Sequence, residues 1–118
     1  MADFRKLGVW RKAHEVMLDS HELAGEIRGA PYLALKSQIV RAAMSIPTNI
    51  VEGRAQRTDR EFHWFLGYAV ASSSELEYHL IAASDIGALP RKKAGQLANK
   101  VVEVRKMLIG LQKTLTGD

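Results

Sequence analysis

Apolar residues recur at steps of three and four along four stretches of the chain, the spacing that places them on one face of an α-helix. The first predicted helix covers about residues 7–28 and includes Trp10, Ala13, Met17, Ala24 and Ile27. It stops before Gly29-Ala30-Pro31, because glycine and proline break helices. The second predicted helix covers about residues 35–53, and it continues through Pro47 because the apolar spacing is unbroken there.

The third and fourth predicted helices begin at recognisable start signals. Thr58 followed three residues later by Glu61 is a capping box, which predicts a helix over residues 59–86. Pro90 is a favoured first-turn residue and predicts a helix over residues 90–115. The apolar residues of this last stretch alternate steps of four and three, as in a heptad seam: Leu97, Val101, Val104, Leu108, Leu111 and Leu115.

The links between these helices are short, which forces neighbouring helices to run antiparallel. The sequence therefore predicts an all-α protein, an antiparallel up-down-up-down four-helix bundle. Its 118 residues suit a single domain over residues 1–118. With 3 Pro and 9 Gly, the chain lacks the turn residues that a fold of many short strands needs.

Composition and motif searches exclude several classes of chemistry. The chain has no cysteine, so disulfides, Cys-ligated zinc, iron–sulfur clusters and thiol catalysis are excluded. Phosphate-binding glycine loops and a nucleophile elbow are missing. Glu75 with His79, and His14 with His21, supply too few ligands for a di-metal site. We expect no enzyme activity, no catalytic residues, no metal and no cofactor.

No secretory signal is recognisable, and the longest uncharged stretch, residues 62–74, is too short to span a bilayer. These observations predict a cytoplasmic protein with no membrane contact.

Polar residues follow one another along the second predicted helix at helical steps: Arg41, Ser45, Asn49 and Glu52. Together with Glu75 of the third helix they would form a partly buried polar cluster. One interpretation is a ligand or proton site, and an enzyme built on this cluster is the least favoured function. The preferred interpretation is structural: the cluster fixes the register of the helices and satisfies backbone groups freed by Pro47.

Two helix faces suggest partners. On the third helix an apolar stripe lies opposite the core line and predicts a subunit interface: Trp64, Tyr68, Ala71, Tyr78 and Ala82. On the first helix an acidic stripe is formed by Glu15, Asp19, Glu22 and Glu26. That stripe is either a solvated face or pairs across subunits with basic residues of the last helix: Arg91, Lys92, Lys93, Lys100 and Arg105.

A formal net charge of +4 permits binding to nucleic acid but does not require it. Arg54, Arg57 and Arg60 cluster at the turn between the second and third helices, and Arg11 and Lys12 are placed near one end of the bundle. Such a group would hold phosphates, or it is solubilising surface charge. No aromatic stacking motif accompanies it, so base-specific recognition is not indicated.

Three blocks of sequence resemble a known family. They are residues 7–14 (LGVWRKAH), residues 35–53 (LKSQIVRAAMSIPTNIVEG), and a third block with Glu61-Phe62, Phe65-Leu66, Ser72 and Ser74-Glu75-Leu76-Glu77. The chain resembles, over about residues 4–115, the four-helix bundle proteins encoded in 23S rRNA intervening sequences. The matching motif positions are Arg41, Ser45, Pro47, Asn49, Glu52, Gly53 and Glu75. Val51 stands where that family usually has Ala, and Ala71 where a Gly commonly precedes the Ser, which bears on how closely the helices approach.

The resemblance implies a small cytosolic bundle that assembles as a five-fold ring. The family is similar to the accessory variability protein of diversity-generating retroelements, a basic pentamer that binds nucleic acid and a reverse transcriptase. Two hypotheses follow. The chain is a non-enzymatic homo-oligomer, with a pentamer favoured, that binds RNA or DNA through backbone phosphates. Alternatively, it is a protein-interaction adaptor or scaffold with no nucleic-acid role.

Overall fold

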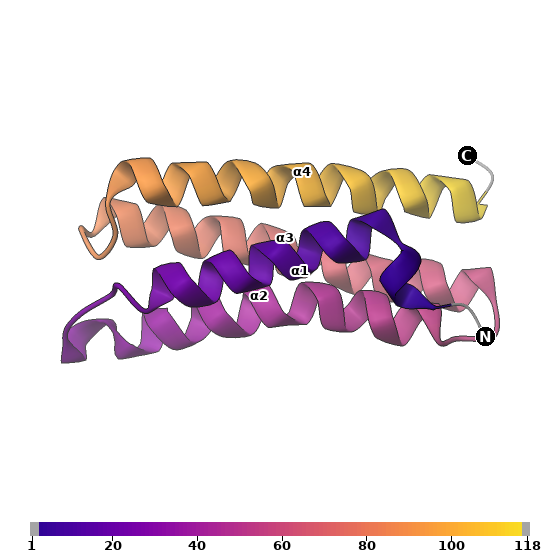
Figure 1. Cartoon of the computed structure of the whole chain (residues 1–118), viewed down its shortest axis with the longest axis horizontal. Coiled ribbons are helices and arrows are strands. Elements are labelled where there is room, and N and C mark those ends of the chain that lie inside the picture. Colours follow the sequence, from indigo (N-terminus) through magenta and orange to yellow (C-terminus); the bar gives the residue numbers. More distant parts are fainter. Residues whose placement is uncertain (1–2, 117–118) are drawn as a thin grey trace.

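The computed structural model describes residues 3–116, which form four long helices and two short 3₁₀ turns. The long helices are α1 (Gly8–Ala24), α2 (Leu33–Arg54), α3 (Asp59–Asp85) and α4 (Arg91–Thr116), and the 3₁₀ turns are η1 (Phe4–Lys6) and η2 (Ala30–Tyr32). Consecutive helices run in opposite directions and lie side by side in a rod of 45 × 23 × 19 Å (Figure 1). The described residues contain no strand, as the sequence predicts.

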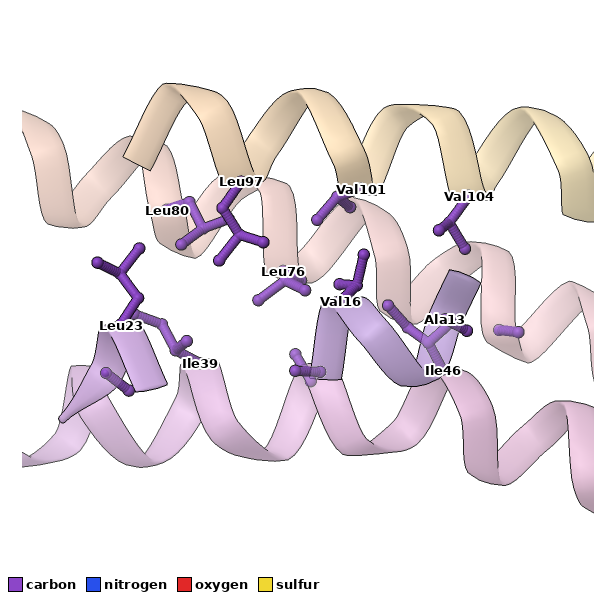
Figure 2. Close-up of a cluster of buried hydrophobic side chains, with 14 of the residues drawn as sticks. Ala13, Val16, Leu23, Ile39, Ile46, Leu76, Leu80, Leu97, Val101 and Val104 are labelled. Atoms are coloured by element: carbon purple, nitrogen blue, oxygen red, sulfur yellow. The ribbon is translucent and has the colours of Figure 1, made fainter. Parts of the chain in front are cut away.

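All four helices contribute to one continuous apolar core along the axis of the rod (Figure 2). The largest side chains that are fully buried come from every helix: Val16, Ile39, Ile46, Ile50, Leu66, Leu76, Leu80, Val101, Val104 and Leu108. The predicted heptad seam of α4 is buried from Leu97 to Leu108, whereas Leu111 and Leu115 pack at its half-buried end.

The first helix is shorter than the sequence predicts, because α1 ends at Ala24 and not near residue 28. After Ala24 the backbone tightens: the N–H groups of Glu26 and Ile27 donate to carbonyls three residues back, at 3.0 and 3.1 Å. Ile27 is nevertheless buried. The apolar spacing therefore continues past the end of the helix, which is why the periodicity overestimates its length.

The other boundaries lie close to the predicted ones. Helix α2 begins two residues early, at Leu33, and passes through Pro47 without a break. The capping box before α3 is confirmed, since the Glu61 N–H donates to Thr58 Oγ1 at 3.1 Å. Helices α3 and α4 agree with prediction to within one residue at each end.

No helix between residues 3 and 116 combines the length and the apolar character that crossing a membrane requires.

Candidate functional site

Four of the five residues predicted to form a polar cluster meet in a groove between α2 and α3. The groove consists of two adjoining depressions of about 360 and 240 Å³, which share Ser45, Ser72 and Glu75. Asn49 lines the larger depression and Arg41 the smaller one. Helical spacing on α2 and the antiparallel course of α3 bring these side chains together.

One hydrogen bond crosses this groove and connects the two helices, and two more lie beside it within α2. The Ser45 and Ser72 hydroxyls lie 2.8 Å apart. The Asn49 amide donates to the Ser45 carbonyl at 2.8 Å and to the Ser45 hydroxyl at 3.0 Å. A hydroxyl pair that is correct in only one alignment of α2 against α3 fixes the register of the two helices.

Two parts of the structural interpretation disagree with the structure: the role given to the cluster at Pro47 and the place given to Glu52. Pro47 removes the backbone donor that would bond the Ala43 carbonyl, yet within residues 3–116 no side-chain hydrogen bond ends on that carbonyl. Glu52 is exposed and lies outside the groove, and its own carbonyl accepts from the Gln56 amide at 2.9 Å. Of the predicted cluster, only Ser45 therefore bonds across to α3, and no described member of it replaces the hydrogen bond that Pro47 removes.

The three hydroxyls of the serine run 72–74 have different hydrogen-bond partners. Ser72 bonds Ser45, whereas the buried Ser73 donates to the Val70 carbonyl at 2.7 Å. Ser74 is exposed and accepts from Arg105 at 3.4 Å. None of these described hydroxyls contacts a histidine or a carboxylate that would activate it as a nucleophile. The spacing of residues along α2 gives no sign of the contact that Ser72 makes with Ser45 in the groove.

Glu75 is the acidic group of the groove, and its side chain is half exposed. Its Oε1 lies 3.4 Å from His79 Nε2, one turn along α3. Arg41 lines the smaller depression beside it without coming within ion-pair distance. Within the part of the chain that the structure describes, no group of three acidic or imidazole side chains is arranged to hold a metal ion.

The outer face of α3 carries the predicted apolar stripe. Its three aromatic side chains are largely exposed, at 64% for Trp64, 50% for Tyr68 and 64% for Tyr78. The rings of Trp64 and Tyr68 stack, with centroids 6.0 Å apart. Ala71 is also exposed, and Ala82 is half-buried. Because the opposite side of α3 is the bundle core, the helix is apolar on two opposite faces.

The predicted phosphate-binding residues differ in burial and in ion pairing. Arg57 and Arg60 are exposed and have no ion-pair partner among residues 3–116, whereas Arg54 is half-buried with its guanidinium 5.8 Å from the Phe62 ring centroid. Arg11 is exposed on α1. Lys12 pairs with Glu15 at 3.7 Å.

An exposed aromatic pair does accompany the arginines, because Trp64 follows Arg60 by one turn of α3. The sequence predicted Trp64 as part of a subunit interface, and its position next to the arginines of the α2–α3 turn was missed.

The sequence of the chain also identifies the family to which it belongs. The model of the 23S rRNA-intervening sequence protein family matches residues 5–110. The chain belongs to that family. The structure is similar to that of a protein of unknown function from the S23 ribosomal protein family of Bacteroides thetaiotaomicron VPI-5482. The two share 24% sequence identity with a TM-score of 0.83, over 89% of this chain and 98% of the other, which establishes a common fold. No curated protein sequence matches the chain.

The residues that carried the resemblance to this intervening-sequence family lie mainly at the contact of α2 with α3. Gly53 makes the closest approach: a Cβ there would lie 2.8 Å from the Phe65 Cβ. Ala71, one of the two departures, is exposed beside the groove, so its methyl group does not separate the helices.

Three of the four carboxylates of the predicted acidic stripe have partners in the same chain, among them Glu15, which pairs with Lys12. Lys93 reaches Glu26 at 2.9 Å, and Lys100 reaches Asp19 at 2.8 Å. The hydrogen bond that Lys100 donates to Asp19, and next the negative charge of Asp19, raise the pKa of Lys100. Of the other basic residues of α4, Arg91 pairs with Asp85 and Arg105 with Glu77 of α3. These pairs form without a second subunit, so they give no support to pairing across subunits.

Proposed function

We propose that this chain is a non-enzymatic, self-associating four-helix bundle that binds RNA or DNA through backbone phosphates. The observation that carries the proposal is the exposed aromatic stripe of α3. A stripe of this kind on a small bundle is typical of a surface that a partner covers. Each aromatic ring buries about 150–250 Å² when it is covered, so three of them supply a large apolar contact.

The family resemblance favours five copies in the assembly. A ring of that kind would repeat the net charge of +4 five times around one axis. The charge of a single chain is modest, and a ring would concentrate it on one surface, where it would attract a polyanion.

The distribution of ion pairs supports phosphate binding at the turn between α2 and α3. On α4, five basic side chains already have carboxylate partners: Arg91, Lys93, Lys100, Arg105 and Lys106. Arg57 and Arg60 have none among the described residues. Asp59 and Glu61 occupy the first turn of α3, so the two guanidinium groups, and not the helix N-terminus, would contact phosphate.

Light scattering tests self-association. The wild-type chain is expected to have a multiple of its 13.1 kDa mass. Replacing Trp64 and Tyr68 by Ser removes two exposed rings from the stripe and is expected to dissociate the assembly. Leu33→Ser is the matched control, because Leu33 is as exposed as Trp64 but lies at the start of α2. A wild-type monomer would contradict the proposal.

Fluorescence anisotropy with labelled RNA and DNA tests phosphate binding. Binding is expected to weaken steeply as salt rises, and Arg57→Gln with Arg60→Gln is expected to lower the slope of log K against log salt by about 1 per residue. Lys93→Gln with Lys100→Gln changes the net charge equally but removes cations that are already paired, so its slope should change less. Absence of binding at low salt would refute the nucleic-acid role.

The adaptor hypothesis has support from the composition of the same surface. Trp, Tyr and Arg are the residues that dominate binding energy at protein–protein interfaces, and Arg60, Trp64 and Tyr68 lie on consecutive turns of α3. A pull-down that recovers one defined protein from nuclease-treated lysate, together with failure of the anisotropy experiment, would favour the adaptor.

A further inference from the structure

The larger depression of the α2–α3 groove has an unusual combination of walls. It is lined by two aromatic rings, a carboxylate, an amide and two hydroxyls, with no basic side chain: Ser45, Asn49, Phe65, Tyr68, Ala71, Ser72 and Glu75. Its volume of about 360 Å³ is ample for one long side chain. An anion would find no cation there, which excludes phosphate as its occupant.

Two free polar atoms of this depression are hydrogen-bond acceptors, the Asn49 amide oxygen and one Glu75 oxygen. The Asn49 amide nitrogen is committed to Ser45, which leaves the amide oxygen as the free end of that side chain. Glu75 contacts His79 through Oε1, so its second oxygen has no partner among the described residues. The rings of Phe65 and Tyr68 lie edge to face beside them, with centroids 6.2 Å apart.

A guanidinium group is the ligand that matches these walls. It carries five N–H donors and no acceptor, it binds carboxylates in a planar fork, and its flat face stacks on aromatic rings. An ammonium group would satisfy the carboxylate but would leave the rings with a poorer partner.

We propose that this depression receives the arginine side chain of a second copy of the chain, which binds Glu75 and the Asn49 amide oxygen and stacks against Tyr68. The inference rests on the proposed self-association. Tyr68, Ala71 and Glu75 belong to the outer face of α3, so a subunit that covers this face also covers the carboxylate. A carboxylate removed from water needs a cation beside it.

The chain has arginines available for this role. Five arginines are exposed and have no ion-pair partner among the described residues: Arg11, Arg28, Arg41, Arg57 and Arg60. Arg41 is the candidate within the same chain, but it lines the neighbouring depression and not this one.

Glu75→Gln tests the carboxylate. The substitution keeps the size of the side chain and is expected to raise the dissociation constant of the assembly about 30-fold or more, the usual range for losing one partner of a buried charge pair. Glu52→Gln is the matched control, because Glu52 is exposed, lies outside the groove and carries the same charge. Sedimentation over a dilution series measures both, and circular dichroism checks that each variant is folded.

A double-mutant cycle identifies the donor. Each of the five arginines is replaced by Gln, alone and together with Glu75→Gln, and the dissociation constants are compared. Replacing the donor arginine should no longer change the dissociation constant when Glu75 is already neutral, because the two residues share one interaction. Exchanging the two charges, with Glu75→Arg and the donor arginine replaced by Glu, should restore association.

The outcomes separate this inference from the proposed function. A monomeric wild type would overturn both. An assembly that Glu75→Gln leaves unchanged would overturn the arginine site alone. Coupling of Glu75 to Arg41 only would overturn the inference, because Arg41 lines the adjoining depression of the same chain, and coupling to none of the five arginines would overturn it as well.

Discussion

Two seams of the bundle, the extensive one of α2 against α3 and the smaller one of α1 against α4, are held by different means. At the first seam, Gly53 admits Phe62 and Phe65 against the backbone, and Ser45 bonds Ser72 across the contact. At the second seam, exposed ion pairs join α4 to α1, Lys100 with Asp19, and to the turn that follows α1, Lys93 with Glu26. Both seams rest on buried apolar side chains from the same core.

The two seams show two ways of aligning helices, one by the shapes of packed side chains and one by charge. A glycine facing a ring and a hydroxyl facing a hydroxyl are correct in one register only, so the first seam is intolerant of a shift. Exposed ion pairs on long, flexible side chains adapt to small shifts and are weakened by salt. The groove and the aromatic stripe both adjoin the first seam, because Tyr68 and Ala71 belong to both of them.

The largest effect is expected at Gly53. In Gly53→Ala the new methyl group would lie 2.8 Å from Phe65 Cβ and 2.9 Å from Phe62 Cδ1. Overpacking of this kind costs about 1–3 kcal/mol and outweighs the gain of about 1 kcal/mol in helix propensity. Gly110→Ala on α4, where the methyl group meets nothing within 4 Å, should stabilise the protein instead. Urea unfolding at one protein concentration measures both, and equal effects would contradict a special role for this contact.

A smaller effect is expected at the hydroxyl pair. Ser45→Ala removes the bond to Ser72 and should lower the free energy of unfolding by about 0.5–1.5 kcal/mol. Adding Ser72→Ala should cost less than it does in the wild type, because the bond is already lost. Strictly additive losses in urea unfolding would show that the two hydroxyls do not interact.

The smallest effect is expected at the ion pairs of the α1–α4 seam. Asp19→Asn leaves Lys100 exposed and hydrated, so the unfolding midpoint should shift only slightly. The shift should be smaller still at high salt, because salt screens the ion pair in the wild type. The pKa of Lys100 is raised above 10.5, so the contribution of the pair is fully present below that pH and is lost as pH rises through the raised value. The difference between wild type and variant in urea unfolding should therefore be constant near neutral pH. A large difference at pH 7 would mean that charge, and not packing, holds this seam.

The sequence predicted the helices well where start and stop signals are local. The capping box at Thr58 and Glu61 set the start of α3, and the heptad seam of α4 is buried from Leu97 to Leu108. The predicted end of α1 was wrong because the buried Ile27 continues the apolar spacing beyond the point where the helical hydrogen-bond pattern changes. Burial and helix formation are separate properties, and periodicity reports only the first.

The candidate site was only partly predictable. Spacing along one helix placed Arg41, Ser45 and Asn49 together, but it also included Glu52, which faces solvent away from the groove. Ser72 was missed as a partner of Ser45 because their contact depends on how α2 and α3 are aligned. Periodicity carries no information about the register between two helices.

The sequence alone determined that this chain forms four antiparallel helices, that it carries an apolar stripe on each side of α3, and that it belongs with the intervening-sequence proteins. These conclusions depend on spacing, short links and motif, which are properties of neighbouring residues. Only the tertiary structure decided which charges are neutralised within the chain, which arginines stay unpaired, and that Glu75 meets Asn49 and Tyr68 in one depression. Those facts depend on distances between helices, and such distances are set by the packing of side chains that lie far apart in the sequence.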